Sequence, residues 1–348
     1  MMESRMYVGT EAGISTLKST DGHGWSSEHE ALGSWEVSAV AVVPGNPSQV
    51  LAGTRGDGVW LSEDAGKSWR KPCYGKRGPG KVRSLAVDPR NPRRIFAGTE
   101  PIDIFVSEDL GQTWERLDSV WDVPFVATVP YPVATVEPHV RSIALDPKEP
   151  NAFYAALQVG YMLKTTDAGR TWTLLNKDVD CDVHTIVIDP SAPERMFVAT
   201  GGSQSRQGQV AGRGLYASTD AGQSWQPTAM EFDQEYSVPL TMDPRDPRIL
   251  YSALAHGNPN RWRRESGAEG LLIRSRDGGQ SWERMAKEVP GLDREFAEAI
   301  VVDPAQTERV YVGLRNGTFL ATEDGGDSWV PLNVETPSVT SASLVRLS

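Results

Sequence analysis

One short pattern, Ser/Thr-x-Asp-x-Gly-x-Ser/Thr-Trp, recurs along the whole chain and constrains its fold more than any other feature. Six full copies and one shortened copy are present: SEDAGKSW (62–69), SEDLGQTW (107–114), TTDAGRTW (165–172), STDAGQSW (218–225), SRDGGQSW (275–282), TEDGGDSW (322–329) and the shortened STDGHGW (19–25). Successive tryptophans of this octapeptide are 44, 45, 58, 53, 57 and 47 residues apart. A repeat of about 40–50 residues is typical of the four-stranded blades of a β-propeller.

We interpret each octapeptide as a turn between two strands. Its Asp carboxylate can accept hydrogen bonds from N–H groups of the same turn. The Gly supplies a positive φ that other residues resist, and the Trp packs back over the turn. This interpretation gives the repeated aspartates a structural role and leaves the chemistry of the protein to other residues.

A second motif precedes the full octapeptides: an apolar strand, Asp-Pro and another apolar strand. SLAVDPRNPRRIFAGT (84–99) and TIVIDPSAPERMFVAT (185–200) are examples. Asp-Pro followed by a second Pro is a turn signal. Each repeat therefore reads as strand a, Asp-Pro turn, strand b, loop, strand c, octapeptide and strand d.

The predicted fold is all-β: a single seven-bladed β-propeller with four antiparallel strands in each blade. The chain begins on a strand b (6–10) and ends on a strand a (341–347). These terminal strands should complete one shared blade and close the ring, which removes open sheet edges. No shift in composition divides the repeats, so we expect residues 1–348 to form one domain.

Composition excludes several classes of function. Lys+Arg 35 against Asp+Glu 46 gives a net charge of -11, the wrong sign for a nucleic-acid binder. No apolar run exceeds six residues (152–157), so no membrane span is expected. The amino-terminal MMESRMYVGT has no apolar stretch before the first strand, which predicts no secretory signal and a cytoplasmic location.

The tandem octapeptides and the strand pairs around Asp-Pro resemble those of the BNR/Asp-box propeller superfamily, and the resemblance covers essentially the whole chain. That superfamily includes sialidases, xyloglucanase-type glycoside hydrolases, sortilin-like receptors and photosystem II assembly factors, so the resemblance implies the fold and leaves the function open. Sialidases carry an early Phe/Tyr-Arg-Ile-Pro segment, whereas this chain reads RMYVGTEAGI (5–14). Xyloglucanase-type enzymes use two facing propellers, and this sequence accounts for one.

The a–b and c–d turns should lie on one face of the ring and the b–c and d–a loops on the other. All large insertions fall on that second face: 115–139, which contains Trp121, Phe125 and Tyr131, and the loops 201–213 and 256–269. Long loops on one rim of a rigid scaffold commonly carry function. We therefore expect the functional site at the channel mouth on this face.

The register of strand a predicts which side chains reach the mouth. The residues five positions before Asp-Pro are Ser38, Arg83, Arg141, His184, Val238, Glu298 and, by extension, Thr340. Two positions earlier, on the same side of the strand, are Glu36, Lys81, His139, Asp182, Tyr236, Phe296 and Ser338. Large apolar residues follow in each strand, so an apolar core should give way to a crown of ionisable groups.

The leading hypothesis is a hydrolase or lyase, similar to a glycoside hydrolase, that acts on an anionic, carboxylated small molecule or sugar. Arg83, Arg141 and Lys81 would bind the carboxylate, because the guanidinium fork matches carboxylate geometry. The candidate acid, base or nucleophile groups are Glu298, His184, Tyr236 and Asp182, and further substrate contacts are predicted from His139, His256, Arg261 and Trp262.

Three alternatives stay open at this level. The crown could consist of satisfied ion pairs between blades, with Arg83 or Arg141 paired to Glu298 or Glu36. The protein could be a non-catalytic scaffold, similar to an assembly factor, that binds a protein or polymer through the rim loops and RWRR (261–264). A divalent metal could bind at His139, His184 and His256 or Asp182, although no HxH or HxxxE spacing supports one and no other cofactor is expected. Cys73 and Cys181 are predicted to be bystanders.

Overall fold

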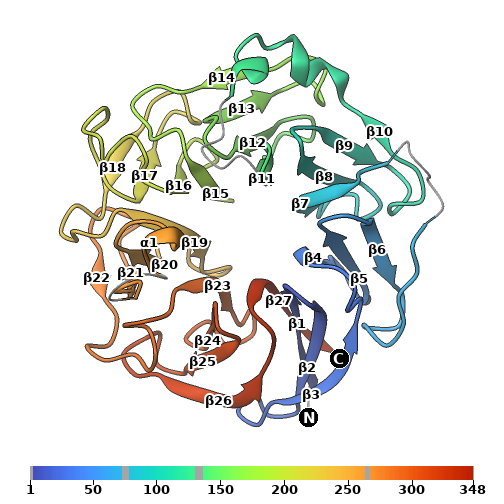
Figure 1. Ribbon diagram of the computed structural model, residues 1–348, viewed down its shortest axis with the longest axis vertical. Coiled ribbons are helices and arrows are strands. Elements are labelled where there is room, and N and C mark those ends of the chain that lie inside the picture. Colours follow the sequence, from blue (N-terminus) through green and yellow to red (C-terminus); the bar gives the residue numbers. More distant parts are fainter. Residues whose placement is uncertain (1–2, 73–77, 130–135, 263–266, 348) are drawn as a thin grey trace.

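The computed structural model describes residues 3–72, 78–129, 136–262 and 267–347. Strands dominate it and form seven small sheets, arranged as blades around a central opening (Figure 1). No helix in these ranges is both long and apolar enough to cross a membrane. The predicted seven-bladed, all-β propeller is confirmed.

The blades follow one another in chain order, and each runs from its innermost to its outermost strand as a, b, c and d. Blade 1 contains β27 (Val339–Leu347), β1 (Glu3–Thr10), β2 (Gly13–Ser19) and β3 (Ser26–Ala31); blade 2 contains β4 (Val37–Val43), β5 (Asn46–Thr54) and β6 (Gly58–Ser62). Blade 3 contains β7 (Lys81–Val87), β8 (Ile95–Glu100), β9 (Ile104–Ser107) and β10 (Glu115–Arg116); blade 4 contains β11 (Val140–Leu145), β12 (Phe153–Leu157), β13 (Met162–Thr165) and β14 (Thr173–Leu175).

The second half of the ring repeats this order. Blade 5 contains β15 (Val183–Ile188), β16 (Met196–Thr200), β17 (Leu215–Ser218) and β18 (Gln226–Thr228); blade 6 contains β19 (Tyr236–Met242), β20 (Leu250–Ala255), β21 (Leu271–Ser275) and β22 (Glu283–Arg284). Blade 7 contains β23 (Ala297–Val302), β24 (Val310–Leu314), β25 (Thr318–Thr322) and β26 (Val330–Glu335). In blade 2 the fourth strand is reduced to one antiparallel bridge between Leu61 and Arg70.

The two ends of the chain close the ring in blade 1. β27 pairs with β1 in antiparallel register from Glu3–Leu347 to Thr10–Val339, with one shift at Gly9 and Thr10. The carboxy-terminal strand is therefore the innermost strand of the blade that the amino terminus begins. This is the predicted closure.

The octapeptide at 62–69 shows the hydrogen bonds that the Asp and Gly of all full copies make; its Trp bond is absent from two copies, in which Trp172 and Trp282 donate to Ser119 and Thr228 instead. Asp64 accepts hydrogen bonds from the Ser68 amide (2.8 Å), the Ser68 hydroxyl (2.6 Å) and the Ser62 hydroxyl (2.9 Å). The Gly66 amide donates to Ser62 Oγ (2.8 Å), and Trp69 Nε1 donates to the Gly66 carbonyl (3.2 Å). Every side chain that defines the pattern in this copy thus bonds inside its own turn.

The octapeptide also fixes the neighbouring Asp-Pro turn. Its fourth residue adopts a positive φ even where it is not glycine, as in Ala65 (61°) and Leu110 (61°). That conformation points the amide at the a–b turn of the same blade: Ala65 N donates to Ser48 O and Leu110 N to Arg93 O, both at 2.8 Å. The two kinds of turn therefore lie on one face, as predicted.

Apolar packing joins each blade to the next. Every junction between neighbouring blades has its own cluster of buried side chains; the blade 6–7 cluster, for example, combines Tyr251 and Leu272 with Val310 and Leu320. Basic side chains of the a–b turns reinforce these junctions by bonding to a carbonyl of the next blade, as Lys148 does to Ser191 O (2.8 Å).

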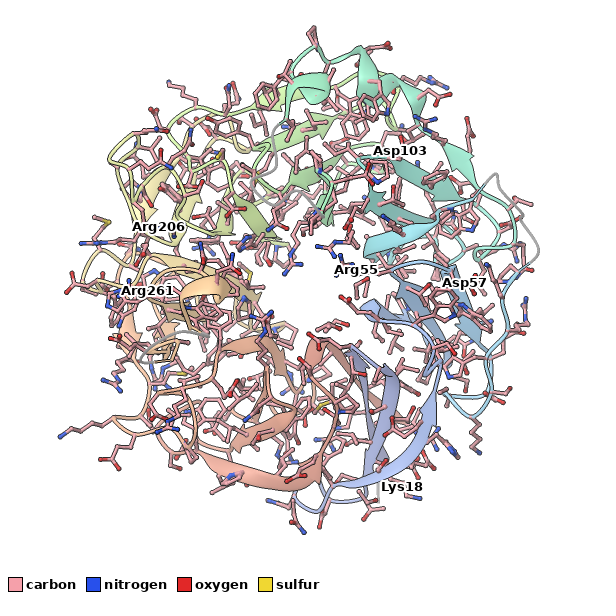
Figure 2. All side chains as sticks on the ribbon, viewed as in Figure 1. Lys18, Arg55, Asp57, Asp103, Arg206 and Arg261 are labelled. Atoms are coloured by element: carbon pink, nitrogen blue, oxygen red, sulfur yellow. The ribbon has the colours of Figure 1, made fainter. Side chains whose placement is uncertain are left out.

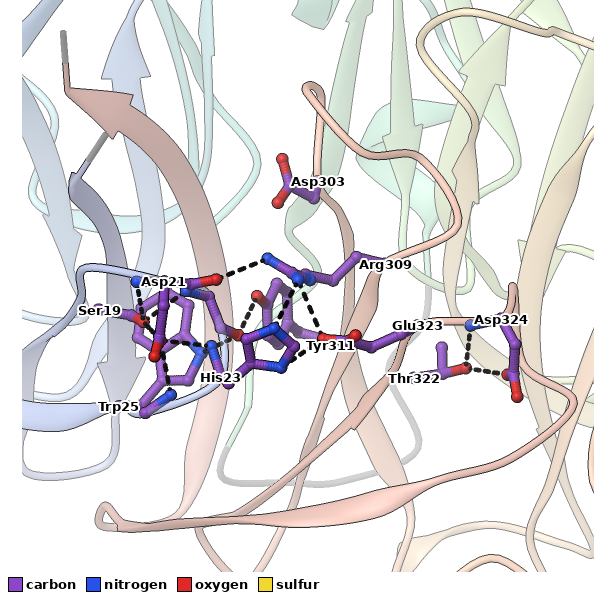
Figure 3. Close-up of polar contacts among 12 residues, drawn as sticks. Ser19, Asp21, His23, Trp25, Asp303, Arg309, Tyr311, Thr322, Glu323 and Asp324 are labelled. Atoms are coloured by element: carbon purple, nitrogen blue, oxygen red, sulfur yellow. Dashed lines mark hydrogen bonds and ion pairs between the residues drawn. The ribbon is translucent and has the colours of Figure 1, made fainter. Parts of the chain in front are cut away.

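The junction between blades 7 and 1 brings together residues nearly 290 positions apart (Figure 3). The Arg309 guanidinium, whose side chain is 7% exposed, pairs with Glu323 (3.0 Å) and donates to the Asp21 carbonyl (3.3 Å). Tyr311 Oη donates to the Gly22 carbonyl (3.0 Å). Arg309 therefore connects the last blade to the shortened octapeptide of the first.

Removing one octapeptide carboxylate should destabilise the fold in a pH-dependent way. Asp220 accepts three hydrogen bonds from Ser218 and Ser224, so Asp220→Ala should lower the free energy of unfolding by about 1–3 kcal/mol at pH 7. These bonds lower the pKa of Asp220 from 3.8 to about 2. The contribution is therefore complete above pH 3.8 and is lost as the pH falls toward 2. Urea unfolding at several pH values measures it, with the exposed Asp233→Ala as control.

Substitution of the buried arginine at the ring junction should also destabilise. Arg309→Ala removes the donor to the Asp21 carbonyl and leaves Glu323 with His23 as its remaining partner, and we expect a loss of about 1–3 kcal/mol in the free energy of unfolding. Arg248 is the matched control, because its side chain is 70% exposed and pairs only with Asp246 of its own turn. Equal thermal midpoints for the two variants would contradict a role for Arg309 in ring closure.

Candidate functional site

Two cavities lie along the central channel and share five lining residues. The mouth cavity, about 310 Å³, is lined by Glu11, Glu36, Ser38, Arg55, Arg83, Arg141, Gln158, Tyr236, Pro259, Glu298, Arg315, Val339 and Thr340. A deeper cavity, about 230 Å³, is lined mainly by strands a. The seven residues predicted to face the channel, Ser38, Arg83, Arg141, His184, Val238, Glu298 and Thr340, all line the deeper cavity. The alignment of the strands on Asp-Pro therefore placed this ring correctly. Of the residues two positions earlier, expected on the same side, only Glu36 and Tyr236 line either cavity, because a β-bulge in each strand a interrupts the alternation at the ring residue.

Arg83 on β7 is compensated by buried partners. Its guanidinium lies 2.8 Å from His139 Nε2 and 3.6 Å from Glu100, a carboxylate whose side chain is 2% exposed. His139 Nδ1 lies 2.9 Å from the Glu137 carbonyl, which makes Nδ1 the protonated nitrogen and Nε2 the acceptor for Arg83. Burial and the Arg83 charge lower the pKa of His139 to about 2, so its ring is neutral.

Arg141 on β11 differs from the other arginines at the mouth. It lines both cavities, yet no described side chain forms an ion pair or a hydrogen bond with its guanidinium. Burial, together with the neighbouring charge of Arg141, lowers the pKa of Arg83 to about 9. Arg141 thus supplies an uncompensated positive charge to the channel mouth.

Glu298 on β23 lines both cavities, whereas Glu11 and Glu36 line only the mouth cavity. Its side chain is 12% exposed and lies 3.6 Å from Arg315. Burial raises the pKa of Glu298, although Arg315 and Arg141 oppose the shift. A carboxyl group whose pKa is raised by burial can hold a proton near neutral pH and donate it to a bound substrate.

His184 and Asp182 form a buried pair next to Tyr236. His184 Nδ1 lies 2.6 Å from the Ser237 carbonyl of the next blade, and Nε2 lies 3.3 Å from Asp182 Oδ1. Asp182 is buried, its pKa is lowered by His184, and it does not line either channel cavity. Tyr236 lines the mouth cavity, and burial raises its pKa, so it is a neutral hydroxyl group there.

The ends of strands b contribute a second ring of charged and polar side chains, which the register of strand a did not predict. Arg55 bonds to both oxygens of Glu36 (3.1 and 3.0 Å) and to Glu100 (3.3 Å), and it lies beside the central opening (Figure 2). Arg315 pairs with Glu298. The sequence contains a pattern that predicts this ring: in five blades the first residue after the YVGT-like strand is charged or polar, namely Glu11, Arg55, Glu100, Gln158 or Arg315.

Several predicted site residues lie away from the cavities. Lys81 is 48% exposed and pairs with Glu100 and Glu137, so it does not line the mouth. His139 faces Arg83 instead of the channel. The ion pairs proposed between Arg83 or Arg141 and Glu298 or Glu36 do not form; Arg55 and Arg315 take these carboxylates instead.

The 256–269 loop also departs from the prediction. His256 lies 3.4 Å from Glu235. Arg261, in the short helix α1 (Pro259–Trp262), is set back from the opening (Figure 2). Trp262 donates to the His256 carbonyl (2.7 Å) and packs against Tyr236 and Phe296 (5.2 and 4.9 Å between ring centroids). Its ring supports the mouth from behind, whereas Arg263 and Arg264 lie outside the described residues.

The structure does not group the proposed metal ligands. Within the described ranges, no three His, Cys, Asp or Glu side chains are placed to hold a metal ion. His139, His184 and His256 face Arg83, Asp182 and Glu235 respectively. A common site for the three histidines is therefore a wrong prediction.

The 115–139 insertion folds mainly against blades 3 and 4. It contains two short 3-10 helices, η2 (Asp118–Asp122) and η3 (Val126–Thr128), whose Val120 and Val126 are buried. Trp121 donates to Asp103 (2.9 Å), and Phe125 packs against Tyr161. Tyr131 lies outside the described residues, and neither Trp121 nor Phe125 lines the channel cavities.

Comparison with known proteins finds relatives of the propeller but no matching family model. A xyloglucanase of Paenibacillus sp is 26% identical over 223 residues, which are 55% of this chain and 20% of the relative. The xyloglucanase Xgh74A of Acetivibrio thermocellus is 24% identical over 220 residues, 54% of this chain and 25% of the relative. The matched region thus spans about a fifth to a quarter of these curated relatives.

Solved structures agree on the fold. An ancestral GH74 enzyme superposes with a TM-score of 0.62 at 21% identity, over 82% of this chain and 36% of that chain. YCF48 from Cyanidioschyzon merolae superposes with a TM-score of 0.58 at 11% identity, over 87% of this chain and 86% of that chain. YCF48 bound to D1 peptide superposes with a TM-score of 0.55 at 14% identity, over 85% of this chain and 81% of that chain. These identities support a shared propeller architecture, and the BNR/Asp-box superfamily stays a resemblance.

The surroundings of Cys181 predict an unreactive thiol. Its side chain is buried, and burial raises its pKa to about 11, whereas a nucleophilic cysteine needs an accessible thiolate. In a Cys73→Ser background, Cys181 is the only thiol. We expect a thiol-specific chromogenic disulfide to label it slowly at pH 8 and completely after denaturation. Rapid labelling of the native protein would contradict this assignment.

Proposed function

We propose that this chain is a propeller glycoside hydrolase that binds an anionic saccharide at the channel mouth. The sequence relatives are xyloglucanases, which supports a carbohydrate ligand and hydrolysis. The mouth chemistry favours a carboxylated sugar over a neutral one. The observation that carries the proposal is the shared cavity of Arg141, an arginine without an ion-pair partner, and Glu298, a carboxyl group with a raised pKa.

Arg141 is the proposed carboxylate-binding residue. An uncompensated guanidinium next to a cavity can form two parallel hydrogen bonds with a carboxylate. Arg83 lies on the neighbouring blade and is held by His139 and Glu100, so it adds positive potential without being free to move. Ser38, Thr340 and Gln158 also line the mouth and offer hydrogen bonds to sugar hydroxyls.

Glu298 is the proposed general acid. Glycoside hydrolysis commonly uses one protonated carboxyl group, which donates to the leaving oxygen, and one carboxylate, which activates water or attacks the anomeric carbon. We assign the second role to Glu36 in the same cavity, whose carboxyl oxygens accept two hydrogen bonds from Arg55. Tyr236 can orient the substrate, and His184 with Asp182 supports the adjoining wall.

The volume of the cavity favours a terminal sugar residue. About 310 Å³ lies at the lower end of the 300–1,000 Å³ typical of ligand sites. One ring can enter such a mouth, whereas a polymer lying across it would leave most of its residues outside. We therefore propose action at the end of an oligosaccharide.

The test is hydrolysis of glucuronate- and galacturonate-terminated oligosaccharides beside neutral xyloglucan oligosaccharides. We expect turnover of a uronate-terminated substrate, a loss of about 10²-fold or more in kcat for Glu298→Gln, and a 10- to 100-fold loss in kcat/KM for Arg141→Ala. Because Glu298 acts protonated, activity should fall as the pH rises through its raised pKa.

Arg116→Ala is the control for these variants, since Arg116 lies on the outermost strand of blade 3 and is 45% exposed. A preference for neutral xyloglucan oligosaccharides, together with an unchanged kcat/KM of Arg141→Ala, would refute the proposal of an anionic substrate. Absence of turnover on every substrate would refute the hydrolase.

A non-catalytic binding protein is the second candidate. Its support is the extent of the structural match: the YCF48 chains are covered over 81% and 86% of their length, whereas the ancestral GH74 enzyme is covered over 36%. Carboxylate binding that depends on Arg141, without any hydrolysis, would favour this candidate.

A further inference from the structure

The mouth cavity contains a second charge without a partner. Glu11 follows β1 of blade 1, is exposed and lines the same cavity as Arg141. In the part of the chain that the structure describes, no cation lies within ion-pair distance of its carboxylate, and no donor bonds to it. Glu36, Glu100 and Glu298, by contrast, are all paired with arginines.

The two unpaired charges belong to opposite sides of the opening. Arg141 is on β11, and Glu11 directly follows β1; Figure 1 shows these two strands across the central opening from each other. Glu11 is on the same side as Glu298, and its charge contributes to the raised pKa of Glu298. Of the charges that line the mouth cavity, the one without an ion pair on blade 4 is therefore positive and the one on blade 1 is negative, while Arg83 and Arg315 face Glu100 and Glu298.

We propose that the mouth is specific for a zwitterionic saccharide, one sugar unit that carries both a carboxylate and a protonated amine. The carboxylate binds Arg141, and the ammonium group binds Glu11 across the cavity. This inference rests on the proposed function only in placing a saccharide at the mouth; it does not require hydrolysis. A ligand with both charges complements both Arg141 and Glu11. A simple uronate leaves Glu11 unpaired and brings a second negative charge, the carboxylate of the ligand, into the same cavity.

Opposed charges also set the orientation of the ligand. Carboxylate at Arg141 and ammonium at Glu11 fix the ring across the channel, and the hydroxyl groups of Ser38 and Thr340 lie on the wall between them. A reversed ligand would bring like charges together, which is unfavourable on both sides. Arg315 lines the same cavity and lies 3.6 Å from Glu298; among the described residues it forms no ion pair with Glu11.

The experiment compares three methyl glycosides by isothermal titration calorimetry at low salt: glucuronate, glucosamine and 2-amino-2-deoxyglucuronate. With the wild-type protein, we expect the amino-uronate to bind roughly fivefold more tightly than glucuronate. Glu11→Gln should abolish that difference and leave glucuronate binding no weaker than in the wild type. Arg141→Gln should weaken both uronates and spare glucosamine.

A double-mutant cycle shows whether the two residues act on different groups of one ligand. Glu335→Gln is the matched control, because Glu335 is an exposed glutamate at the end of the outermost strand β26. Thermal midpoints of all variants verify folding, which the exposed position of Glu11 should leave unchanged.

The outcomes separate this inference from the proposed function. Equal affinity for glucuronate and the amino-uronate, or a preference that survives Glu11→Gln, overturns the zwitterionic ligand whether or not the protein hydrolyses anything. A preference that depends on Glu11, without turnover of any oligosaccharide, supports the inference and overturns only the hydrolase. Absence of binding by all three sugars overturns both.

Discussion

Closure of the ring by β27 and β1 is the interaction on which the arrangement of the channel depends. Their antiparallel pairing joins the two ends of the chain into one blade and places blade 7 beside blade 1. Arg309 secures the same junction through the Asp21 carbonyl and Glu323. Because the innermost strands are held around one axis, their polar ends line one cavity, and charges from distant parts of the sequence share it.

The channel mouth illustrates how a propeller tolerates charge in a partly buried place. Removing a charge from water is costly unless a partner compensates it. Most of the crown meets this condition: Arg55 holds Glu36 and Glu100, Glu100 also lies near Arg83, and Arg315 lies near Glu298. Arg141 is the half-buried exception, because no described side chain forms an ion pair with it, whereas Glu11 in the same cavity is exposed to water and is also without an ion pair. A ligand that supplies the missing partners would complete a network that the protein leaves open, and this is the physical reason for locating the site there.

The relatives show how one architecture can serve different chemistry. About a quarter of the residues aligned between this chain and the xyloglucanases are identical, and the YCF48 structures match most of this chain at 11% and 14% identity. The octapeptides and Asp-Pro turns lie on the face away from the channel mouth and are bonded within themselves. In this chain the side chains that build the turns are therefore separate from the side chains that line the mouth.

The sequence by itself determined the turns, the strands, the number of blades and the ring of residues that line the channel. These features depend on contacts within a few residues, such as the Asp64–Ser68 hydrogen bonds, or, for the ring, on the constant position of each residue before the Asp-Pro turn, where every strand a carries a β-bulge. The sequence did not determine which charges are compensated. Arg55 and Arg315 take the carboxylates that had been assigned to Arg83 and Arg141, and Lys81, His256 and Arg261 lie outside the mouth. Only the tertiary structure decides such pairings, because each joins side chains from different strands or blades and depends on loop conformations that no local pattern encodes.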